Sequence, residues 1–285
     1  QEFEAGRGFE GRYGQYCALD LTHLGEAVIE SKLPFVRELS RTYVGVDPVY
    51  EYIPIRPVVH YMMGGVDTDI RAATDVPGLF AAGETACASL NGANRLGSNS
   101  LTECLVFGAS AGNNALAFAR GSSEGSEASL RAQAQEEAAR VVALRGRKQG
   151  RERIAGLRQE MNKTMEDGCG VYRRQESMQA SVKKMAELKQ RSADLKLDDG
   201  SKVFNTEVIA ALELVNMIEV AESLAVSAAH RKESRGAHTC RDFPARDDTN
   251  YLYHTLCHRD PAGGAPRLGR KEVKLGHWVP EERKY

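Results

Sequence analysis

An acid, an arginine and several glycines occur close together at residues 83–101, in the stretch GETACASLNGANRLGSNSL. Glu84 ends a short apolar run, GLFAAGE, which predicts a buried strand, and an acid at the end of such a strand can accept hydrogen bonds from ribose hydroxyls. Arg95 lies between glycines, where its planar guanidinium would suit the two oxygens of a carboxylate. The combination points to a dinucleotide and an anion, with a surface acid and a structural salt bridge as the plain alternatives.

Three further residues could contribute to such a site. The SLTE pattern at 100–103 has the form of a capping box, so we expect Ser100 to be the N-cap of a helix or to lie one residue from it. The backbone amides of Ser100 and Leu101 would then face negative charge on a bound group. His60, before YMMGG, could donate a hydrogen bond to an anion, although a lone buried histidine is more often structural.

Two other patterns carry less weight. GRGFEG at 6–11 fits GxGxxG by letters, but no apolar strand precedes it and no clear helix follows, so we do not expect it to bind phosphate. Several metal-ligand side chains fall within a short span of the tail, at His238, Cys240, His254, Cys257 and His258. Their spacing fits no standard zinc pattern, and we predict no metal site.

The composition indicates a folded chain with no dominant charge. The 285 residues are 42% hydrophobic and 27% charged, with a formal net charge of −1. This leaves enough apolar surface for a core and no single-sign field to attract nucleic acid. The longest apolar runs, such as VIAALELV, are interrupted by charge well before the roughly 20 residues that a membrane span needs. We therefore expect no nucleic-acid partner and no direct membrane span.

Helical spacing dominates the second half of the chain. After the polar linker GSSEGSE, apolar residues recur at helical intervals over about 127–145, 150–167, 174–195 and 206–232, which predicts an antiparallel helical bundle. The tail from His238 has no clear period, and we expect it to form a small irregular domain with short strands. The expected fold class is α+β, leaning to helix.

Three motifs closely resemble those of the succinate dehydrogenase and fumarate reductase flavoproteins: HYMMGGVDTD at 60–69, VPGLFAAGE at 76–84 and NGANRLGSNSL at 91–101. The resemblance continues through MEDGCGVYR, FNTEV, RKESRGAH and RDFPARDD, so it covers nearly the whole chain. Asn91 departs from the family, whose members commonly have histidine before Gly-Ala-Asn-Arg. Because asparagine can still donate and accept, only the local hydrogen bonding is in question.

The resemblance implies roles for particular residues. In that family, the residues that match His60 and Arg95 hold the dicarboxylate against the flavin, and the residue that matches Glu84 binds FAD. Those that match Ser100 and Leu101 contact the flavin ring. The family's reaction is hydride transfer between FAD and the carbon–carbon bond of succinate or fumarate, with electrons passed to an iron–sulfur subunit. The implied partners are a dicarboxylate, that subunit and, through it, a membrane anchor at the cytoplasmic face of the inner membrane.

The resemblance also divides the chain into the end of a capping domain at 1–57, the second half of an FAD-binding domain at 58–120, a helical domain at 121–239 and a C-terminal domain at 240–285. The family's N-terminal dinucleotide fingerprint, flavin-linking histidine and proton-delivering arginine have no match, and the chain begins without Met. We therefore expect it to be truncated and inactive alone. Two alternatives stay open: an L-aspartate oxidase-like flavoenzyme, or a non-catalytic fragment that only docks on a partner subunit.

Overall fold

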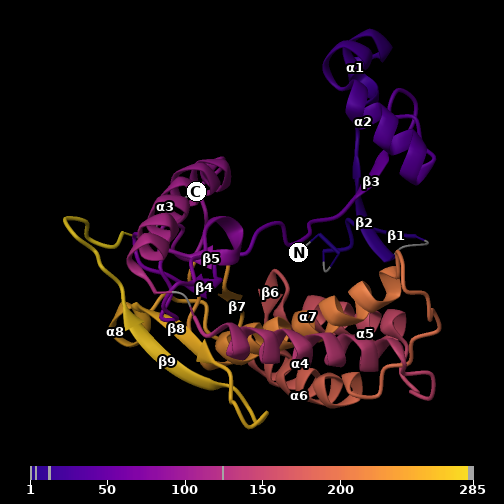
Figure 1. The fold of residues 1–285 in the computed structure, drawn as a ribbon. Helices are drawn as coiled ribbons and strands as arrows, with labels where there is room; N and C mark the ends of the chain where they lie inside the picture. The colour runs from indigo at the N-terminus through magenta and orange to yellow at the C-terminus, as the bar shows by residue number, and fades with distance from the viewer. Residues whose placement is uncertain (1, 4, 12–13, 124, 282–285) are drawn as a thin grey trace. The chain divides into compact units, whose positions relative to one another are not determined.

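The computed structural model describes residues 2–3, 5–11, 14–123 and 125–281. By its contacts, the chain divides into two compact units, Gln1–His60 and Tyr61–Tyr285. Figure 1 labels the helices and strands of both units. Within the described ranges, no helix combines the length and the apolar composition that crossing a bilayer requires.

The first unit contains a small antiparallel sheet and several short helices. Strands β1 (Phe9–Gly11), β2 (Gly14–Leu19) and β3 (Ile53–Ile55) pair in the order β1-β2-β3. Between β2 and β3 come the 3-10 helix η1 (Thr22–Leu24), α1 (Glu26–Lys32), α2 (Pro34–Leu39) and the π-helix η2 (Ser40–Val44). The chain thus leaves the sheet after β2 and returns to it only at β3.

A buried arginine joins the helices of this unit. Arg37 is 8% exposed, and its Nη2 lies 2.8 Å from Asp47 Oδ2 while its Nη1 lies 3.0 Å from Glu26 Oε1. Glu30 also pairs with it. Asp47 above all, together with these glutamates, raises the pKa of Arg37, so the guanidinium remains charged and paired as its burial requires.

The second unit begins with two short parallel strands, β4 (Val66–Asp67) and β5 (Ala86–Cys87). The 3-10 helix η3 (Gly83–Thr85) precedes β5, and the long helix α3 (Asn99–Gly121) follows the glycine-rich loop. The expected buried strand over 78–84 is wrong, because Phe80 makes only an isolated antiparallel bridge with Ala73. Gly78 and Gly83 have φ angles of 85° and 75°, and these left-handed residues interrupt the extended backbone.

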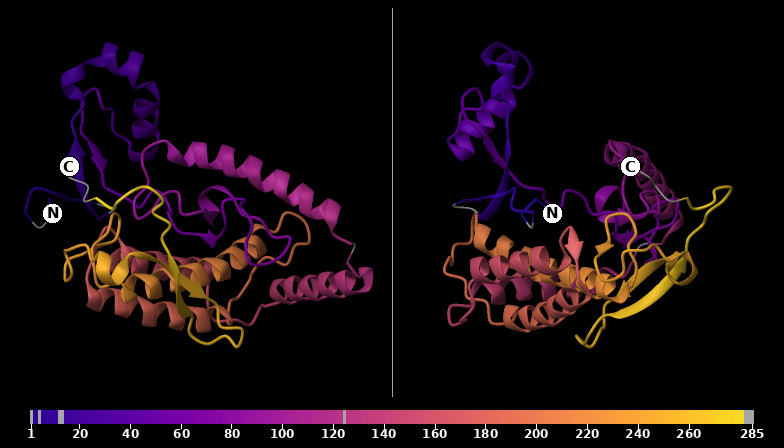
Figure 2. Two further views of the ribbon diagram at one scale, coloured as in Figure 1. Left: turned by 90° about the vertical axis from the view of Figure 1, so that its left-hand side faces the viewer. Right: turned by 180° about the vertical axis from the view of Figure 1, so that it is seen from behind.

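The predicted helices of the second half are confirmed as α4 (Glu127–Arg145), α5 (Ile154–Cys169), α6 (Gln175–Ser192) and α7 (Thr206–His230). Helices α5, α6 and α7 pack against one another and lie side by side in Figures 1 and 2. Their buried side chains recur every three or four residues, as in the α6 series Met178, Ser181, Met185, Leu188 and Ser192. This stripe is the face that an amphipathic helix turns toward a core.

Short strands complete the second unit, as we predicted for the sequence from His238 onward. Strand β6 (Tyr172–Arg173) pairs in parallel with β7 (Thr239–Cys240). After helix α8 (Asp248–Tyr251), strands β8 (Tyr253–His258) and β9 (Arg267–Glu272) form an antiparallel hairpin. Lys271 of β9 pairs with Asp67 of β4, with Nζ 2.6 Å from Oδ1. The expected α+β class is confirmed, and the four-part domain division stays a prediction.

Candidate active site

Arg95 lies in the glycine-rich loop between β5 and α3, with its guanidinium against an aromatic ring. Its Cζ is 4.3 Å from the centroid of the Tyr61 ring, and its Nη1 donates to the carbonyl of neighbouring Leu96 at 3.1 Å. The Nε atom is buried and has no hydrogen-bond partner among the described residues. A buried N–H without an acceptor is costly, so this edge of the guanidinium suits an incoming anion.

The hydroxyl of the same tyrosine is bound to a buried carboxylate near the start of α3. Glu103 is 2% exposed, and its Oε2 accepts hydrogen bonds from the Tyr61 hydroxyl at 2.7 Å and from Asn91 Nδ2 at 2.8 Å. Burial, followed by the hydrogen bond to Glu103, raises the pKa of Tyr61 to about 12. The phenol therefore stays protonated, and remains a donor, near neutral pH.

Sequence reasoning missed Tyr61 and Glu103. The capping-box expectation was wrong, because α3 begins at Asn99 and its N-cap is Ser98, with a φ of 67° and no side-chain cap. Ser100 is therefore the second helical residue. Glu103 does not reach back to cap the helix but binds the hydroxyl of Tyr61, 42 residues earlier. No local pattern connects these two positions, since their contact is long-range.

The other predicted site residues of the second unit lie on either side of Arg95 in the sequence. Glu84 is exposed in η3 rather than at a strand end, and its Oε1 accepts from the backbone N–H of Met62 at 3.0 Å. Ser100 is half-buried, and Leu101 is 71% exposed. The Leu101 N–H donates to the Ser98 carbonyl at 3.2 Å, and the first turn of α3 still carries the positive end of the helix dipole.

Two consecutive residues connect Arg95 and Glu84. Tyr61 supplies the ring against Arg95, and the N–H of Met62 binds Glu84. His60, which immediately precedes them in sequence, is exposed and is the last residue of the first unit. The structure thus gathers Glu84 and Arg95 around the segment that follows His60.

C-terminal elements contact the loop that carries Arg95. The N–H of Ala237 donates to the carbonyl of Ala93 at 2.9 Å, and a Cβ added to Gly236 would lie 2.5 Å from that same oxygen. The loop is also bound at Ser89, whose Oγ is 2.7 Å from His254 Nε2 in β8. The turn before β7 and the β8–β9 hairpin therefore both help to place the loop.

The histidines of the tail have partners of other kinds. Nδ1 of His238 lies 2.8 Å from Nη1 of Arg173, and burial, followed by the charge of Arg173, lowers the pKa of His238 to about 4. The neutral imidazole thus accepts a hydrogen bond from the guanidinium. Across the residues that the structure describes, no group of three or more His, Cys, Asp or Glu side chains is placed to hold a metal ion.

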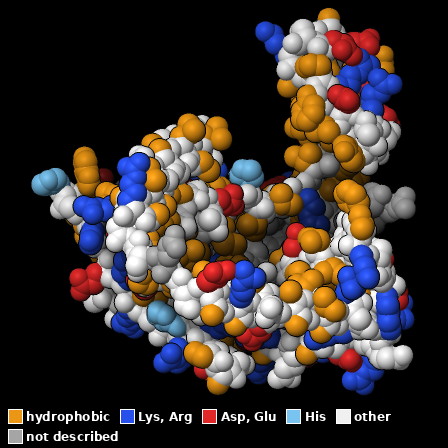
Figure 3. All heavy atoms as spheres, viewed as in Figure 1, with side chains coloured by type: hydrophobic (Ala, Val, Ile, Leu, Met, Phe, Trp, Pro, Cys, Tyr) orange, Lys and Arg blue, Asp and Glu red, His pale blue; other side chains and the backbone are white. Residues whose placement is uncertain are grey.

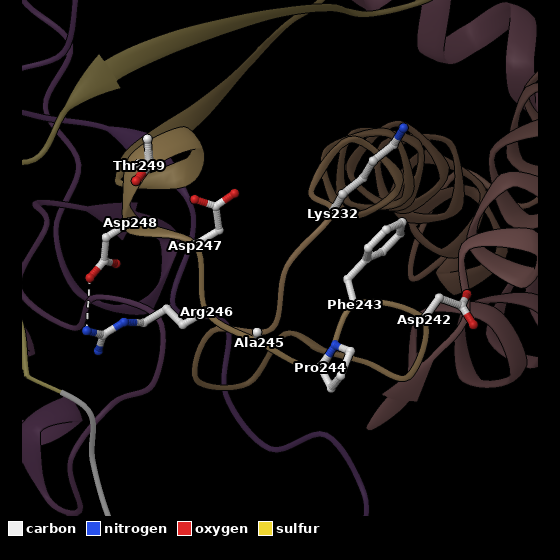
Figure 4. Close-up of a pocket in the computed structure, with 9 residues that line it drawn as sticks. All are labelled: Lys232, Asp242, Phe243, Pro244, Ala245, Arg246, Asp247, Asp248 and Thr249. Carbon is white, nitrogen blue, oxygen red and sulfur yellow. Dashed lines mark ion pairs between the residues drawn. The ribbon is translucent and has the colours of Figure 1, made fainter.

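A cavity of about 530 Å³ lies in the RDFPARDD segment (Figure 4). It is lined by Lys232 and residues 242–249, and it includes the ion pair between Arg246 Nη2 and Asp248 Oδ2 at 2.9 Å. None of the residues predicted to bind substrate or cofactor lines this cavity.

Large apolar side chains are exposed along α3. Leu101, Leu105 and Val106 are 71%, 76% and 58% exposed, and Figure 3 shows hydrophobic side chains on the surface of this helix. Large exposed apolar side chains gathered in one turn of a helix are typical of a face that is covered by another group or by more protein.

Known proteins match both parts of the chain. Residues 1–101 match the FAD binding domain family, and residues 158–285 match the fumarate reductase flavoprotein C-terminal family. The chain is 50% identical over 288 residues to the fumarate reductase flavoprotein subunit of Mycobacterium tuberculosis, and 41% identical over 273 residues to the succinate dehydrogenase flavoprotein subunit of Coxiella burnetii. The alignments cover 100% and 91% of this chain but only 49% and 46% of the length of the two relatives. The chain therefore spans about half the length of these curated relatives.

Solved structures agree with the sequence matches. Quinol fumarate reductase of Escherichia coli superposes with a TM-score of 0.92 at 45% identity, covering 99% of this chain and 48% of that chain. Adenylylsulfate reductase of Archaeoglobus fulgidus, with a TM-score of 0.61 at 18% identity, shares the fold alone. With the fold, both family matches and the relatives in agreement, the chain belongs to the succinate dehydrogenase and fumarate reductase flavoprotein family.

Proposed function

We propose that this chain carries the substrate-binding arginine and part of the FAD site of a flavoprotein that interconverts succinate and fumarate. The observation that supports this most directly is the state of Arg95. Its guanidinium lies against the Tyr61 ring, while its buried Nε has no hydrogen-bond partner among the described residues. Such a guanidinium offers an oriented edge to a carboxylate.

In this proposal, Arg95 and His60 bind the dicarboxylate. Arg95 forms paired hydrogen bonds with one carboxylate and balances its charge, and His60 donates a hydrogen bond to the same anion. Held in this way, the carbon–carbon bond of the substrate has a fixed position and an environment that stabilises negative charge during the reaction. Proximity and electrostatic stabilisation are the contributions that fixed side chains of this kind supply.

The residues near Arg95 fit FAD in two respects. The exposed carboxylate of Glu84 can accept hydrogen bonds from ribose hydroxyls while its Oε1 still accepts the hydrogen bond from the N–H of Met62. The first turn of α3, at Ser100 and Leu101, offers the positive end of a helix dipole to the flavin ring. Bound FAD would supply the chemistry of hydride transfer.

We further propose that electrons pass between this flavoprotein and an iron–sulfur subunit. That subunit would join a membrane anchor and hold the assembly, as a peripheral protein, at the cytoplasmic face of the inner membrane. The support is the relationship to the E. coli enzyme, whose name identifies it as a quinol fumarate reductase. A reaction that couples fumarate to a quinol needs a route for electrons between flavin and quinol, and an iron–sulfur subunit would supply one.

Substitution of Arg95 tests the proposed function in the complete flavoprotein subunit, produced from the gene that encodes this stretch. We expect Arg95→Ala to lower succinate-dependent dye reduction by about a thousandfold, because the side chain stabilises charge in the transition state. The FAD content should stay the same, because no FAD contact is removed. Steady-state kinetics and flavin absorbance measure the two quantities.

Arg131→Ala is the matched control. Arg131 is an exposed arginine of α4 that pairs with Glu127 one turn earlier, at 2.7 Å, so its loss should leave turnover near the wild-type value. Near-normal turnover of Arg95→Ala would refute the proposal. Peroxide formation with L-aspartate, in place of turnover with succinate, would instead identify an aspartate oxidase.

A further inference from the structure

Arg95 is oriented mainly by a contact from outside its own loop. Its hydrogen bond to Leu96 is to the neighbouring residue, so it fixes little of the long side chain. The Cζ of Arg95 lies over the Tyr61 ring, 4.3 Å from the ring centroid. A guanidinium held over an aromatic ring is restricted in how it can turn, and its N–H groups that do not face the ring stay available for a ligand.

The ring is itself fixed at its far end. The Tyr61 hydroxyl donates to Glu103 Oε2 at 2.7 Å, and the same oxygen accepts from Asn91 Nδ2 at 2.8 Å. Glu103 is 2% exposed and belongs to helix α3, so its position is set by a rigid element. Asn91 lies in the loop of Arg95, and one carboxylate oxygen thus holds both the ring and the loop.

A buried carboxylate needs such partners, and its charge is not used elsewhere in the proposed reaction. Burying an acid is unfavourable unless donors surround it. The phenol remains a donor because its pKa is raised to about 12. Glu103, Tyr61 and Arg95 therefore form a continuous series of contacts from α3 to the guanidinium.

We propose that Tyr61 and Glu103 are positioning residues for Arg95: Glu103 fixes the phenol and the loop, and the phenol ring fixes the plane of the guanidinium that receives the substrate carboxylate. This rests on the proposed function, since it assigns Arg95 to the dicarboxylate. Neither residue touches the substrate in this arrangement, and each acts through Arg95.

The test measures the Kd of succinate in the complete flavoprotein, from the change in flavin absorbance on titration, together with FAD content. We expect Tyr61→Leu and Glu103→Leu to raise the Kd about tenfold or more, because the guanidinium becomes free to turn. Glu103→Gln keeps an oxygen acceptor for the phenol and should stay within about threefold of the wild type. Tyr61→Phe keeps the ring and loses only the hydrogen bond to Glu103. Its Kd should therefore lie between about threefold and about tenfold above the wild-type value.

The same changes in an Arg95→Ala background separate positioning from general damage. With no guanidinium to orient, Tyr61→Leu and Glu103→Leu should not weaken succinate binding further than Arg95→Ala alone does. If Glu103→Leu does not fold, Tyr61→Phe and Glu103→Gln still give the comparison. The inference would be overturned if Tyr61→Leu and Tyr61→Phe leave the Kd of succinate unchanged. It would also be overturned if Tyr61→Leu and Glu103→Leu raise the Kd by the same factor in the Arg95→Ala background as in the wild type.

The wild-type titration identifies which idea has failed. If the wild-type flavoprotein binds no dicarboxylate, the proposed function is wrong and the inference falls with it. If it binds succinate and every variant binds equally well, only the positioning role is overturned.

Discussion

His238 is kept neutral by its surroundings. Burial, followed by the charge of Arg173, lowers its pKa to about 4, whereas a histidine in an unfolded chain titrates near 6.5. As the pH falls below about 6.5, the unfolded chain therefore binds the proton first, and folding loses stability until the pH reaches about 4. Because the side chain is only partly shielded from water, we expect a loss of about 1 to 2 kcal/mol.

Chemical unfolding of wild type and His238→Gln, followed by circular dichroism at pH 7 and pH 4.5, measures this contribution. The wild type should lose about 1 to 2 kcal/mol more than the variant between these pH values. His277→Gln, at an exposed histidine, is the control and should behave like the wild type. Identical pH dependence in wild type and His238→Gln would show that the imidazole does not contribute.

Residue type and spacing were enough to propose Arg95 and Glu84 as site residues, because an arginine between glycines and an acid after an apolar run are local features. They were insufficient for Tyr61 and Glu103. The sequence suggested a nearby partner for Glu103, at the N-cap, but the structure brings Tyr61 to it from 42 residues away. A long-range contact of this kind depends on how two elements pack, which local patterns do not encode.

The turn before β7 determines how closely the C-terminal elements approach the loop of Arg95. Gly236 has a φ of 56°, and a Cβ there would lie 2.5 Å from the Ala93 carbonyl oxygen. We expect Gly236→Ala to cost about 1 to 2 kcal/mol for the left-handed backbone and about 1 to 3 kcal/mol more for the clash. Displacement of Ala93 should also weaken succinate binding, because Arg95 lies two residues further on.

Gly263→Ala separates these two costs. Gly263 has a φ of 79°, and a Cβ there would have nothing within 4 Å, so it carries the backbone cost alone. Chemical unfolding and succinate titration of both variants give the comparison. Equal losses of stability and unchanged succinate binding in both would show that the approach of Gly236 to Ala93 is unimportant.

The helical elements were the most predictable part of the fold. Apolar residues recur at intervals of three and four residues in α6 and α7, and the buried side chains of each helix follow the same intervals. The strand expected over 78–84 failed because Gly78 and Gly83 adopt left-handed conformations, a choice that an apolar run does not reveal. The start of α3 was misplaced for a similar reason, since Ser98 also has a positive φ.

At the scale of the whole molecule, the chain spans about half of its relatives' length. We propose that the FAD site is completed by the part of such flavoproteins outside the matched span. We expect the 285-residue chain alone to lose FAD on gel filtration and to show no turnover, whereas the complete subunit keeps its flavin. The exposed leucines of α3 support this expectation, because a cofactor-binding face is normally covered.

Flavin absorbance after gel filtration, with succinate-dependent dye reduction, measures both properties on the two proteins. Circular dichroism of the short chain is the control, since a helical signal shows that lost flavin does not reflect an unfolded protein. A yellow and active preparation of the short chain would contradict the expectation and would place a complete site within these residues.

The pairing of Lys271 with Asp67 joins residues 204 positions apart in the sequence. During synthesis, strand β4 and the loop of Arg95 leave the ribosome long before the β8–β9 hairpin exists. Contacts of such long range form late and slowly. Until Lys271 has been translated, β4 and the loop of Arg95 therefore lack the contacts that the β8–β9 hairpin supplies.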